Sequence, residues 1–419
     1  MKRTAVVVTV VLGLWASGAP AKDPPGPPRD RPREDGKKYS IEQACSDRAQ
    51  TNTIAFDALA FLTGNLGSCT FLPPGKVSDY FGFQYMRDID TGAGGHNTDF
   101  LTNIANNVWL ALNEKQRAQM IALAREQAGP IRELARKRFP LIKAFRRQLD
   151  GDIPAGSKGL DRDAVKKCAA DLFELDGRLA FQRARALGGI ARSLDARQKA
   201  DLGKLVFGNS KTWPAMEEQV DKRGFTHEEH VALMTYASEF FSWYAGSVEA
   251  DVYFCPERHG TYFGSFYMKD APAMGKKGYS ISTALTGDKG EAFLAALTPA
   301  QRELITGLVD LQRKDLTEIV KTRRAVAVEL RRFMKDDSAD EKAVLALARK
   351  YGELDGEIAF LYATRFAQVN ATLSDAQRQN LMKLRDLDAF PCKGAYLYSD
   401  PIDMPSIPDT DFLFGVPNK

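Results

Sequence analysis

An internal repeat constrains the fold of this chain more than any other feature of its sequence. Four segments occur twice, in the same order, and the spacing between the two copies changes little from one segment to the next. Chance does not produce an ordered set of this kind, so the sequence predicts two homologous halves. The matched pairs are 79–88 with 261–270, 111–123 with 296–308, 174–181 with 353–360, and 194–205 with 373–384.

The apolar residues of each half recur at helical spacing, most clearly over residues 297–334. The matching stretch of the first half contains Pro130 and Pro140, where the second half has Asp315 and Ala325. A proline inside a helix removes a hydrogen bond and clashes with the preceding turn. We therefore expect this helix to be kinked or broken in the first half only.

A Leu-x-x-x-Gln box recurs four times, twice in each half. The residue after each leucine is a good N-cap, and the glutamine at the third helical position completes a capping box. Capping alone therefore explains the repeated glutamine, and each box marks a helix start. The boxes are Leu112–Gln116, Leu194–Gln198, Leu297–Gln301 and Leu373–Gln377, with the N-caps Asn113, Asp195, Thr298 and Ser374.

The boxes LTPAQ and LSDAQ, which begin at Leu297 and Leu373, resemble the LTxxQ boxes of Spy/CpxP-like periplasmic proteins. Members of that family are small all-α proteins of the bacterial envelope with two boxes per unit. They act as ATP-independent chaperones or as accessory proteins of metal and envelope-stress responses. This chain departs from the family in its duplication, its longer units and its aromatic YFG segments. The resemblance implies the fold and carries over no catalytic residue.

The sequence thus predicts an all-α fold with two homologous helical-hairpin domains from an internal duplication, and with short irregular aromatic segments. The first domain spans 40–210, the second spans 225–390, and an extended C-terminal tail covers 391–419. Gly177 and Gly356 occupy matched places inside helical patterns, where glycine costs about 1 kcal/mol relative to alanine. Their presence in both halves predicts a close approach of two helices.

The first 21 residues have the pattern of a secretory signal peptide. Lys2 and Arg3 precede an apolar run, and Ala19-Pro20-Ala21 is a small-x-small cleavage signal. Residues 22–38 are rich in Pro, Asp and Arg, which predicts a disordered tether. No other apolar run is long enough to span a bilayer. We expect a periplasmic or secreted protein with no transmembrane segment after cleavage.

Three histidines and a cysteine lie within one stretch of the second half. His227 and His230 are one helical turn apart, and Cys255 and His259 follow in a predicted loop. Imidazole and thiolate ligands suit zinc or copper, so these four residues form a candidate metal site. The matching region of the first half has no histidine. The alternative is a plain helix start, capped by Thr226, whose histidines are solvated.

The YFG segments are aromatic, and their alternation favours extended chain. One interpretation is an aromatic plug that closes each helical hairpin. The other is a binding surface for apolar peptide or a small ligand, in which the aspartates orient a polar group. The candidate ligand-binding residues are Tyr80, Phe81, Tyr85 and Asp88 in the first half and Tyr262, Phe263, Tyr267 and Asp270 in the second.

The net charge and the motifs of the sequence limit the classes of function that we expect. A formal charge of +4, which loss of Lys2 and Arg3 would lower further, gives no argument for nucleic-acid binding. Haem-attachment, nucleophile-elbow and phosphate-loop motifs are missing from the sequence, so we assign no catalytic residue and favour a non-enzyme while leaving enzymatic activity open. We favour an exported binding protein, a Spy-like chaperone or envelope-stress factor whose partners are unfolded or apolar protein segments. The alternatives are a periplasmic metal-binding accessory or sensor protein and an enzyme of unknown chemistry in an inter-domain cleft.

Overall fold

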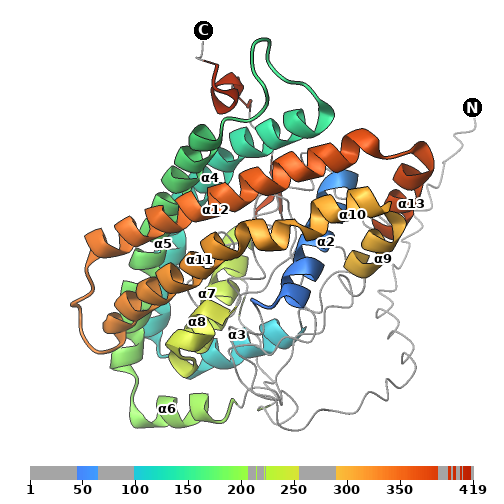
Figure 1. Ribbon diagram of the computed structural model, residues 1–419. Coiled ribbons are helices and arrows are strands. Elements are labelled where there is room, and N and C mark those ends of the chain that lie inside the picture. The colour runs from blue at the N-terminus through green and yellow to red at the C-terminus, as the bar shows by residue number, and fades with distance from the viewer. Residues whose placement is uncertain are drawn as a thin grey trace, which may run out of the picture. The chain divides into compact units, whose positions relative to one another are not determined.

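Helices account for nearly all of the chain that the computed structural model describes (Figure 1). The described residues are 45–64, 99–205, 214, 221, 223–253, 289–385, 395–397, 400–402, 406–407 and 409–416. All of them belong to one unit, residues 38–419. The predicted all-α class is confirmed. Within the described ranges the only strands are β1 (Ala395–Leu397) and β2 (Asp400–Ile402), a short antiparallel pair.

The helices of the two halves follow one another in a matching order. Helices α2, α4, α5 and α6 of the first half correspond to α7, α10, α12 and α13 of the second, and the spacing between their start residues is nearly constant. This order agrees with the sequence repeat, while the common origin of the halves stays a prediction. The first half contains α2 (Asp47–Thr63), α3 (Asp99–Ala111), α4 (Glu114–Asp150), α5 (Arg162–Ser193) and α6 (Ala196–Gly203). The second contains α7 (His227–Ala245), α8 (Val248–Tyr253), α9 (Lys289–Ala296), α10 (Pro299–Thr306), α11 (Leu308–Arg331), η5 (Arg332–Met334), α12 (Glu341–Thr372) and α13 (Asp375–Arg385).

None of the described helices is both long enough and apolar enough to cross a membrane.

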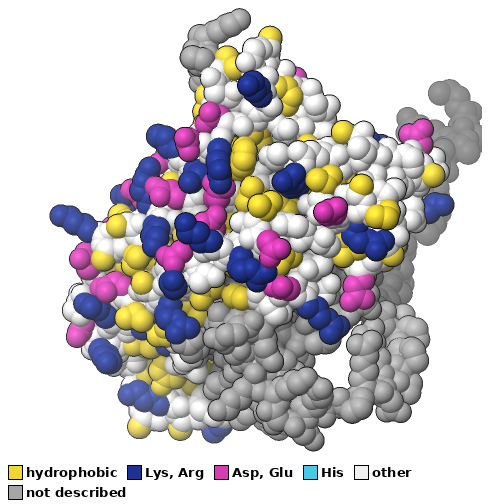
Figure 2. Space-filling model, in the orientation of Figure 1, with side chains coloured by type: hydrophobic (Ala, Val, Ile, Leu, Met, Phe, Trp, Pro, Cys, Tyr) yellow, Lys and Arg dark blue, Asp and Glu magenta, His cyan; other side chains and the backbone are white. Residues whose placement is uncertain are grey.

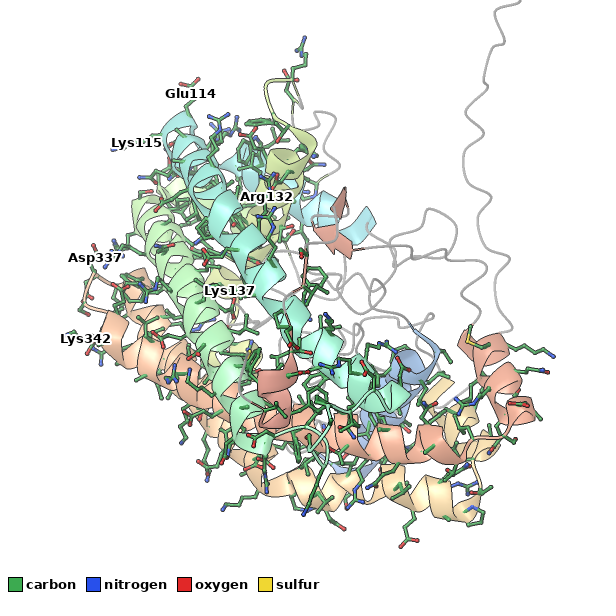
Figure 3. The ribbon with its side chains drawn as sticks, turned by 90° about the horizontal axis from the view of Figure 1, so that it is seen from above. Glu114, Lys115, Arg132, Lys137, Asp337 and Lys342 are labelled. Atoms are coloured by element: carbon green, nitrogen blue, oxygen red, sulfur yellow. The ribbon has the colours of Figure 1, made fainter. Side chains whose placement is uncertain are left out.

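The long helix of the first half is not broken at its prolines, so the predicted break is wrong, while the alternative of a kink stays a prediction. Helix α4 runs from Glu114 to Asp150 through Pro130 and Pro140 (Figure 3). The interruption lies in the second half, where Gly307 separates α10 from α11. Buried neighbours of the prolines, such as Ile131 and Leu141, anchor α4 in the core. Their packing compensates for the hydrogen bonds that proline removes, whereas glycine lowers helix propensity at the second-half break.

Helices α5 and α12 form the main contact between the halves (Figure 1). A Cβ atom built on Gly177 would lie 2.4 Å from the Cβ atom of Ala348, and one built on Gly356 would lie 2.8 Å from that of Ala169. The predicted close approach is therefore confirmed. The same repeat spacing relates Gly177 to Gly356 and Ala169 to Ala348, so the contact is reciprocal. A twofold relation between two equivalent helices produces such reciprocity.

Helices α2 and α7 each pack in the other half. Helix α7 packs on α3 and α4, while α2 packs on α9, α10, α11, α12 and α13. Residues 53–59 of α2 and 236–243 of α7 are all buried, so each helix is enclosed on every side. Each bundle is thus completed by a helix whose sequence belongs to the other half, and the two halves form a single unit.

All four Leu-x-x-x-Gln boxes are capping boxes, as predicted. The structure adds that their glutamines pair within each half. Gln198 Nε2 donates to Gln116 Oε1 at 2.6 Å, and Gln377 Nε2 donates to Gln301 Oε1 at 2.8 Å. Each glutamine also donates to the end of a neighbouring helix. The acceptors are Ser193, Ala111, Thr372 and Ala296.

Part of the predicted C-terminal tail is folded onto the α4–α5 connection (Figure 1). Residues Asp411–Phe414 form the 3-10 helix η6. Arg147 donates to the Asp411 carboxylate at 2.8 Å and lies 4.9 Å from the centre of the Phe414 ring. The backbone N–H of Asp161 donates to the carbonyl of Leu413 at 2.7 Å. This segment therefore joins the end of the chain to the first-half bundle.

Candidate functional site

The predicted helix start at Thr226 is confirmed. The Glu229 N–H donates to Thr226 Oγ1 at 3.1 Å, and the Thr226 N–H donates to Glu229 Oε2 at 2.9 Å. Glu228 and Glu229 occupy the first turn, where negative charge is favourable next to the helix dipole. His227 begins the helix, and the His230 side chain is half-buried one turn later. The local sequence therefore fixes the spacing of these two histidines.

Two ion pairs join the first turn of α7 to the middle of α4. Arg125 Nε donates to Glu229 Oε1 at 2.7 Å, and Arg132, which projects from α4 (Figure 3), pairs with Glu228. The hydrogen bond from the Thr226 backbone, followed by that from Arg125, lowers the pKa of Glu229. The stability from this carboxylate is present above the ordinary glutamate pKa. It is lost as the pH falls through the lowered pKa.

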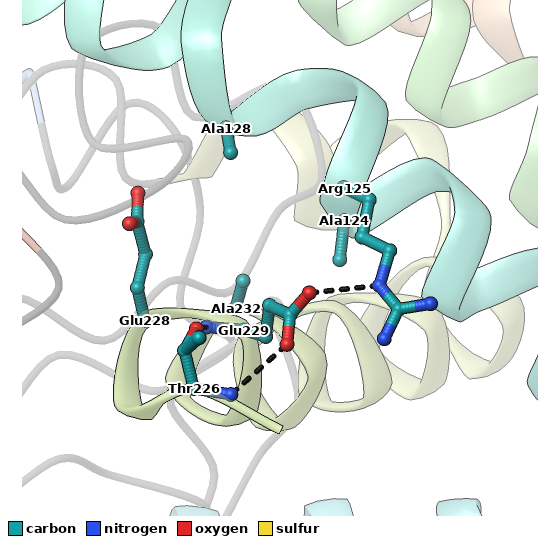
Figure 4. Close-up of a pocket in the computed structure, with 7 residues that line it drawn as sticks. All are labelled: Ala124, Arg125, Ala128, Thr226, Glu228, Glu229 and Ala232. Atoms are coloured by element: carbon teal, nitrogen blue, oxygen red, sulfur yellow. Dashed lines mark hydrogen bonds and ion pairs between the residues drawn. The ribbon is translucent and has the colours of Figure 1, made fainter. Parts of the chain in front are cut away.

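A pocket of about 170 Å³ lies between α4 and the start of α7 (Figure 4). Three alanine methyl groups give it apolar walls, and Glu228 supplies a polar one. The Glu228 Oε1 atom is buried and accepts no hydrogen bond from any described residue. This chemistry suits a small group that donates a hydrogen bond. The lining residues are Ala124, Arg125, Ala128, Thr226, Glu228, Glu229 and Ala232.

The predicted four-ligand metal site requires the chain to return from the end of α7 to its start, and α8 shortens the distance that the chain can cover. Helix α7 ends at Ala245, about 27 Å from its start at 1.5 Å per residue. Five of the ten steps from Ala245 to Cys255 lie within α8. Even a fully extended chain elsewhere then covers only about 25 Å. Helix α8 packs mainly on α11, so its principal contact is not with α7, along which the chain would have to return.

The described structure therefore brings together only part of the predicted metal set. His227 and His230 share the first turn of α7, while Cys255 and His259 lie outside the described residues. Within the described ranges, no group of three or more His, Cys, Asp or Glu side chains is arranged to hold a metal ion. The four-residue site stays a prediction.

The predicted aromatic ligand-binding residues also lie outside the described residues. They fall in two ranges, 65–98 and 254–288, that separate α2 from α3 and α8 from α9. Both interpretations of the YFG segments, the plug and the binding surface, therefore stay predictions. The affected residues are Tyr80, Phe81, Tyr85, Asp88, Tyr262, Phe263, Tyr267 and Asp270.

A buried polar cluster ties α7 into the first-half bundle. Arg183 of α5 pairs with Glu239 of α7 at 3.0 Å, and both side chains are at most 3% exposed. The Arg183 guanidinium also donates to Gln127 Oε1 at 3.2 Å and lies 4.5 Å from the centre of the Tyr236 ring. Tyr236 donates its hydroxyl to the same Gln127 oxygen at 2.9 Å. A guanidinium thus balances the one carboxylate of this cluster.

The equivalent cluster of the second half has a phenol in place of the guanidinium. Tyr362 is the counterpart of Arg183 in the sequence repeat. Asp57 on α2 corresponds to Glu239 on α7 at the spacing that relates segment 79–88 to segment 261–270. The Tyr362 hydroxyl donates to Gln312 Oε1 at 2.6 Å. Asp57 is fully buried, and no described residue donates a hydrogen bond to either of its carboxyl oxygens. Burial raises the pKa of Asp57 well above its usual range, and burial also raises the pKa of Tyr362.

Sequence reasoning missed both polar clusters. The signal was a carboxylate inside an apolar run at matched positions, AFDALAF around Asp57 and SEFFSW around Glu239. A charged residue in such a run is rarely buried without a partner. Comparing the two runs at the repeat spacing would have shown that both carboxylates lie at the same place in the fold.

Comparison with models of known protein families, with curated proteins and with solved structures finds no match.

Proposed function

We propose that this chain is an exported, non-enzymatic binding protein, a Spy-like chaperone or envelope-stress factor that holds apolar segments of client proteins. The observation that carries the proposal is the pairing of the boxes. Their glutamines interlock two by two, through Gln116 with Gln198 and Gln301 with Gln377. One chain therefore contains two units with two boxes each, the number that the family resemblance implies for a unit.

The surface of α11 and α12 supports this proposal. Leu311 and Val328 of α11 are each about half exposed. Figure 2 shows hydrophobic side chains interspersed with Lys, Arg, Asp and Glu across this face. Leu311 and Val328 are 17 residues apart on α11, so they are two separate apolar contact points for a client segment and not one continuous patch. Charges of both signs around them keep such a surface soluble and allow clients of either charge.

Aggregation of a reduced, unfolded globular protein tests client binding. We expect the native protein to slow this aggregation, and we expect Leu311→Asp with Val328→Asp to weaken the effect several-fold. Met382→Asp is the matched control, because Met382 on α13 is equally exposed outside the α11–α12 face. Light scattering follows the aggregation. The proposal fails if the native protein leaves the aggregation rate unchanged at a several-fold molar excess.

Metal binding is the second candidate function, and the position of two histidines favours it. His227 and His230 lie one turn apart at the start of α7, beside the pocket that contains Glu228. We expect zinc or copper to copurify with the native protein, and His230→Ala to reduce the bound metal. Elemental analysis gives the amount of bound metal. His96→Ala is the control, because His96 is the one histidine of the sequence outside the stretch 227–259. Metal-free native protein that does not bind added zinc or copper in a calorimetric titration would eliminate this candidate.

A further inference from the structure

The two polar clusters differ in one respect that matters for α2. In the first-half bundle, the Glu239 carboxylate of α7 pairs with the Arg183 guanidinium of α5. In the second-half bundle, the Asp57 carboxyl of α2 faces the Tyr362 phenol of α12, and both side chains are fully buried. We propose that Asp57 is a proton-dependent lock on α2. The protonated carboxyl keeps α2 seated among the second-half helices, and loss of that proton releases it.

The position of Asp57 on α2 makes its charge matter. Residues 53–59 are buried without interruption, and Asp57 lies near the middle of the helix. At the start of α2, Asp47 pairs with Arg313 at 2.7 Å. Near its end, the Arg146 guanidinium lies 4.2 Å from the centre of the Phe61 ring. Both cations are therefore at the ends of the helix and neither is placed to balance Asp57.

The other helices around α2 donate no hydrogen bond to Asp57 from their described residues. From α12, Tyr362 faces it, and Asp355 is buried on the same helix. The buried cation of α11, Arg323, donates to the Asp251 carbonyl on α8 at 2.8 Å. An ionised Asp57 would therefore gain no charge-assisted hydrogen bond, and the groups that face it from α12 are neutral or become negative when ionised.

The remaining charged side chains described on the helices that pack on α2 are at least partly exposed or have partners elsewhere. Glu357 is buried on α12 and pairs with Arg162 of α5. The half-buried ones are Asp315, Glu318, Glu329, Arg331, Arg349 and Arg365, and the exposed ones are Glu291, Arg302, Glu303, Asp310, Lys314, Lys321, Arg324, Glu341, Lys342, Lys350, Glu353, Asp375, Arg378 and Lys383.

Ionisation in this setting costs free energy because the charge leaves water and gains no partner. Burial raises the pKa of folded Asp57 above the value it has in the unfolded chain. The stability that depends on its proton is therefore fully present below the unfolded pKa. That stability is lost as the pH rises through the folded pKa. Release of α2 would expose Ile54, Leu59 and Phe61, all of which are fully buried.

Asp57→Asn in the full-length chain tests the lock. A carboxamide has nearly the shape of a protonated carboxyl and cannot ionise. We expect the native protein to show hydrogen-exchange protection of α2, corrected for intrinsic rates, that falls at least tenfold between mildly acidic and mildly alkaline pH. In Asp57→Asn this fall should be absent. The thermal midpoint of the variant should exceed that of the native protein at alkaline pH and match it at acidic pH.

Asp375→Asn is the matched control, because this exposed carboxyl on α13 should leave the pH dependence of α2 unchanged. An infrared carbonyl band of a buried protonated carboxyl, present in the native protein and missing from Asp57→Asn, gives an independent readout. The proposal is overturned if Asp57→Asn keeps the native pH dependence of α2. It is equally overturned if the variant is less stable at every pH or does not fold, since a neutral side chain should be tolerated.

Discussion

Glu239→Gln is expected to destabilise the protein by about 3–5 kcal/mol, because it leaves a buried charge without its counter-ion. The Arg183 and Glu239 side chains are 3% and 2% exposed, and their closest nitrogen and oxygen atoms are 3.0 Å apart. Glutamine preserves the volume of the side chain and removes only the negative charge. Urea unfolding followed by circular dichroism gives the free energy of unfolding. A loss below about 1 kcal/mol would contradict the expected role of this pair.

A double variant separates the charge effect from damage to the packing. Arg183→Met with Glu239→Leu replaces both ionic groups with apolar ones of similar size. Such a replacement is often neutral, so the double variant should recover most of the stability lost in Glu239→Gln. If the double variant were as unstable as the single one, the surrounding hydrogen bonds to Gln127 would be the larger contribution.

At alkaline pH, Asp57→Asn should raise the stability of the protein, whereas Glu239→Gln lowers it. Asp57 has no hydrogen-bonded cation to lose, so Asp57→Asn removes a charge that the bundle does not balance. Glu239→Gln removes a charge that the bundle does balance. Two carboxylates at matched positions in the repeat therefore differ because of one residue on the facing helix, arginine in one half and tyrosine in the other.

Local chemistry explains which parts of the fold the sequence could predict. A capping box involves residues three positions apart, so the boxes were recognisable from residues such as Thr298 and Gln301 alone. The partner of each glutamine lies much farther away, 82 residues for Gln116 and 76 residues for Gln301. Spacing within a helix contains no information on such a pair, and only the three-dimensional arrangement shows it.

The exchange of α2 and α7 had no local signal either. An apolar pattern on all sides of a helix predicts that it is buried, but does not say in which bundle. The pairing of α2 with the second half depends on contacts such as Gln50 with Gln312, which are 262 residues apart. The candidate metal site also depends on an arrangement that has no local signal in the sequence. The spacing of His227 and His230 was predictable, while the direction of α8 after α7 was not.

Gly188→Ala and Gly189→Ala are neighbouring changes on α5 that we expect to act in opposite directions. A Cβ atom on Gly188 would lie 2.4 Å from the Phe333 carbonyl oxygen and 2.6 Å from the Phe333 Cβ atom. Alanine there forces η5 away from α5, at a cost of about 1–3 kcal/mol for overpacking. A Cβ atom on Gly189 meets no described atom within 4 Å, so alanine should gain up to about 1 kcal/mol of helix propensity.

The difference in stability between the two variants measures the contact between Gly188 and Phe333. It excludes a general effect of helix propensity, because both changes add one methyl group to the same helix. Phe333 is fully buried, and its ring lies 5.0 Å from that of Phe181 on α5. Movement of η5 would therefore also separate this aromatic pair. Urea unfolding of the two variants side by side gives the difference in free energy of unfolding. Equal effects from Gly188→Ala and Gly189→Ala would show that α5 and η5 can separate without loss.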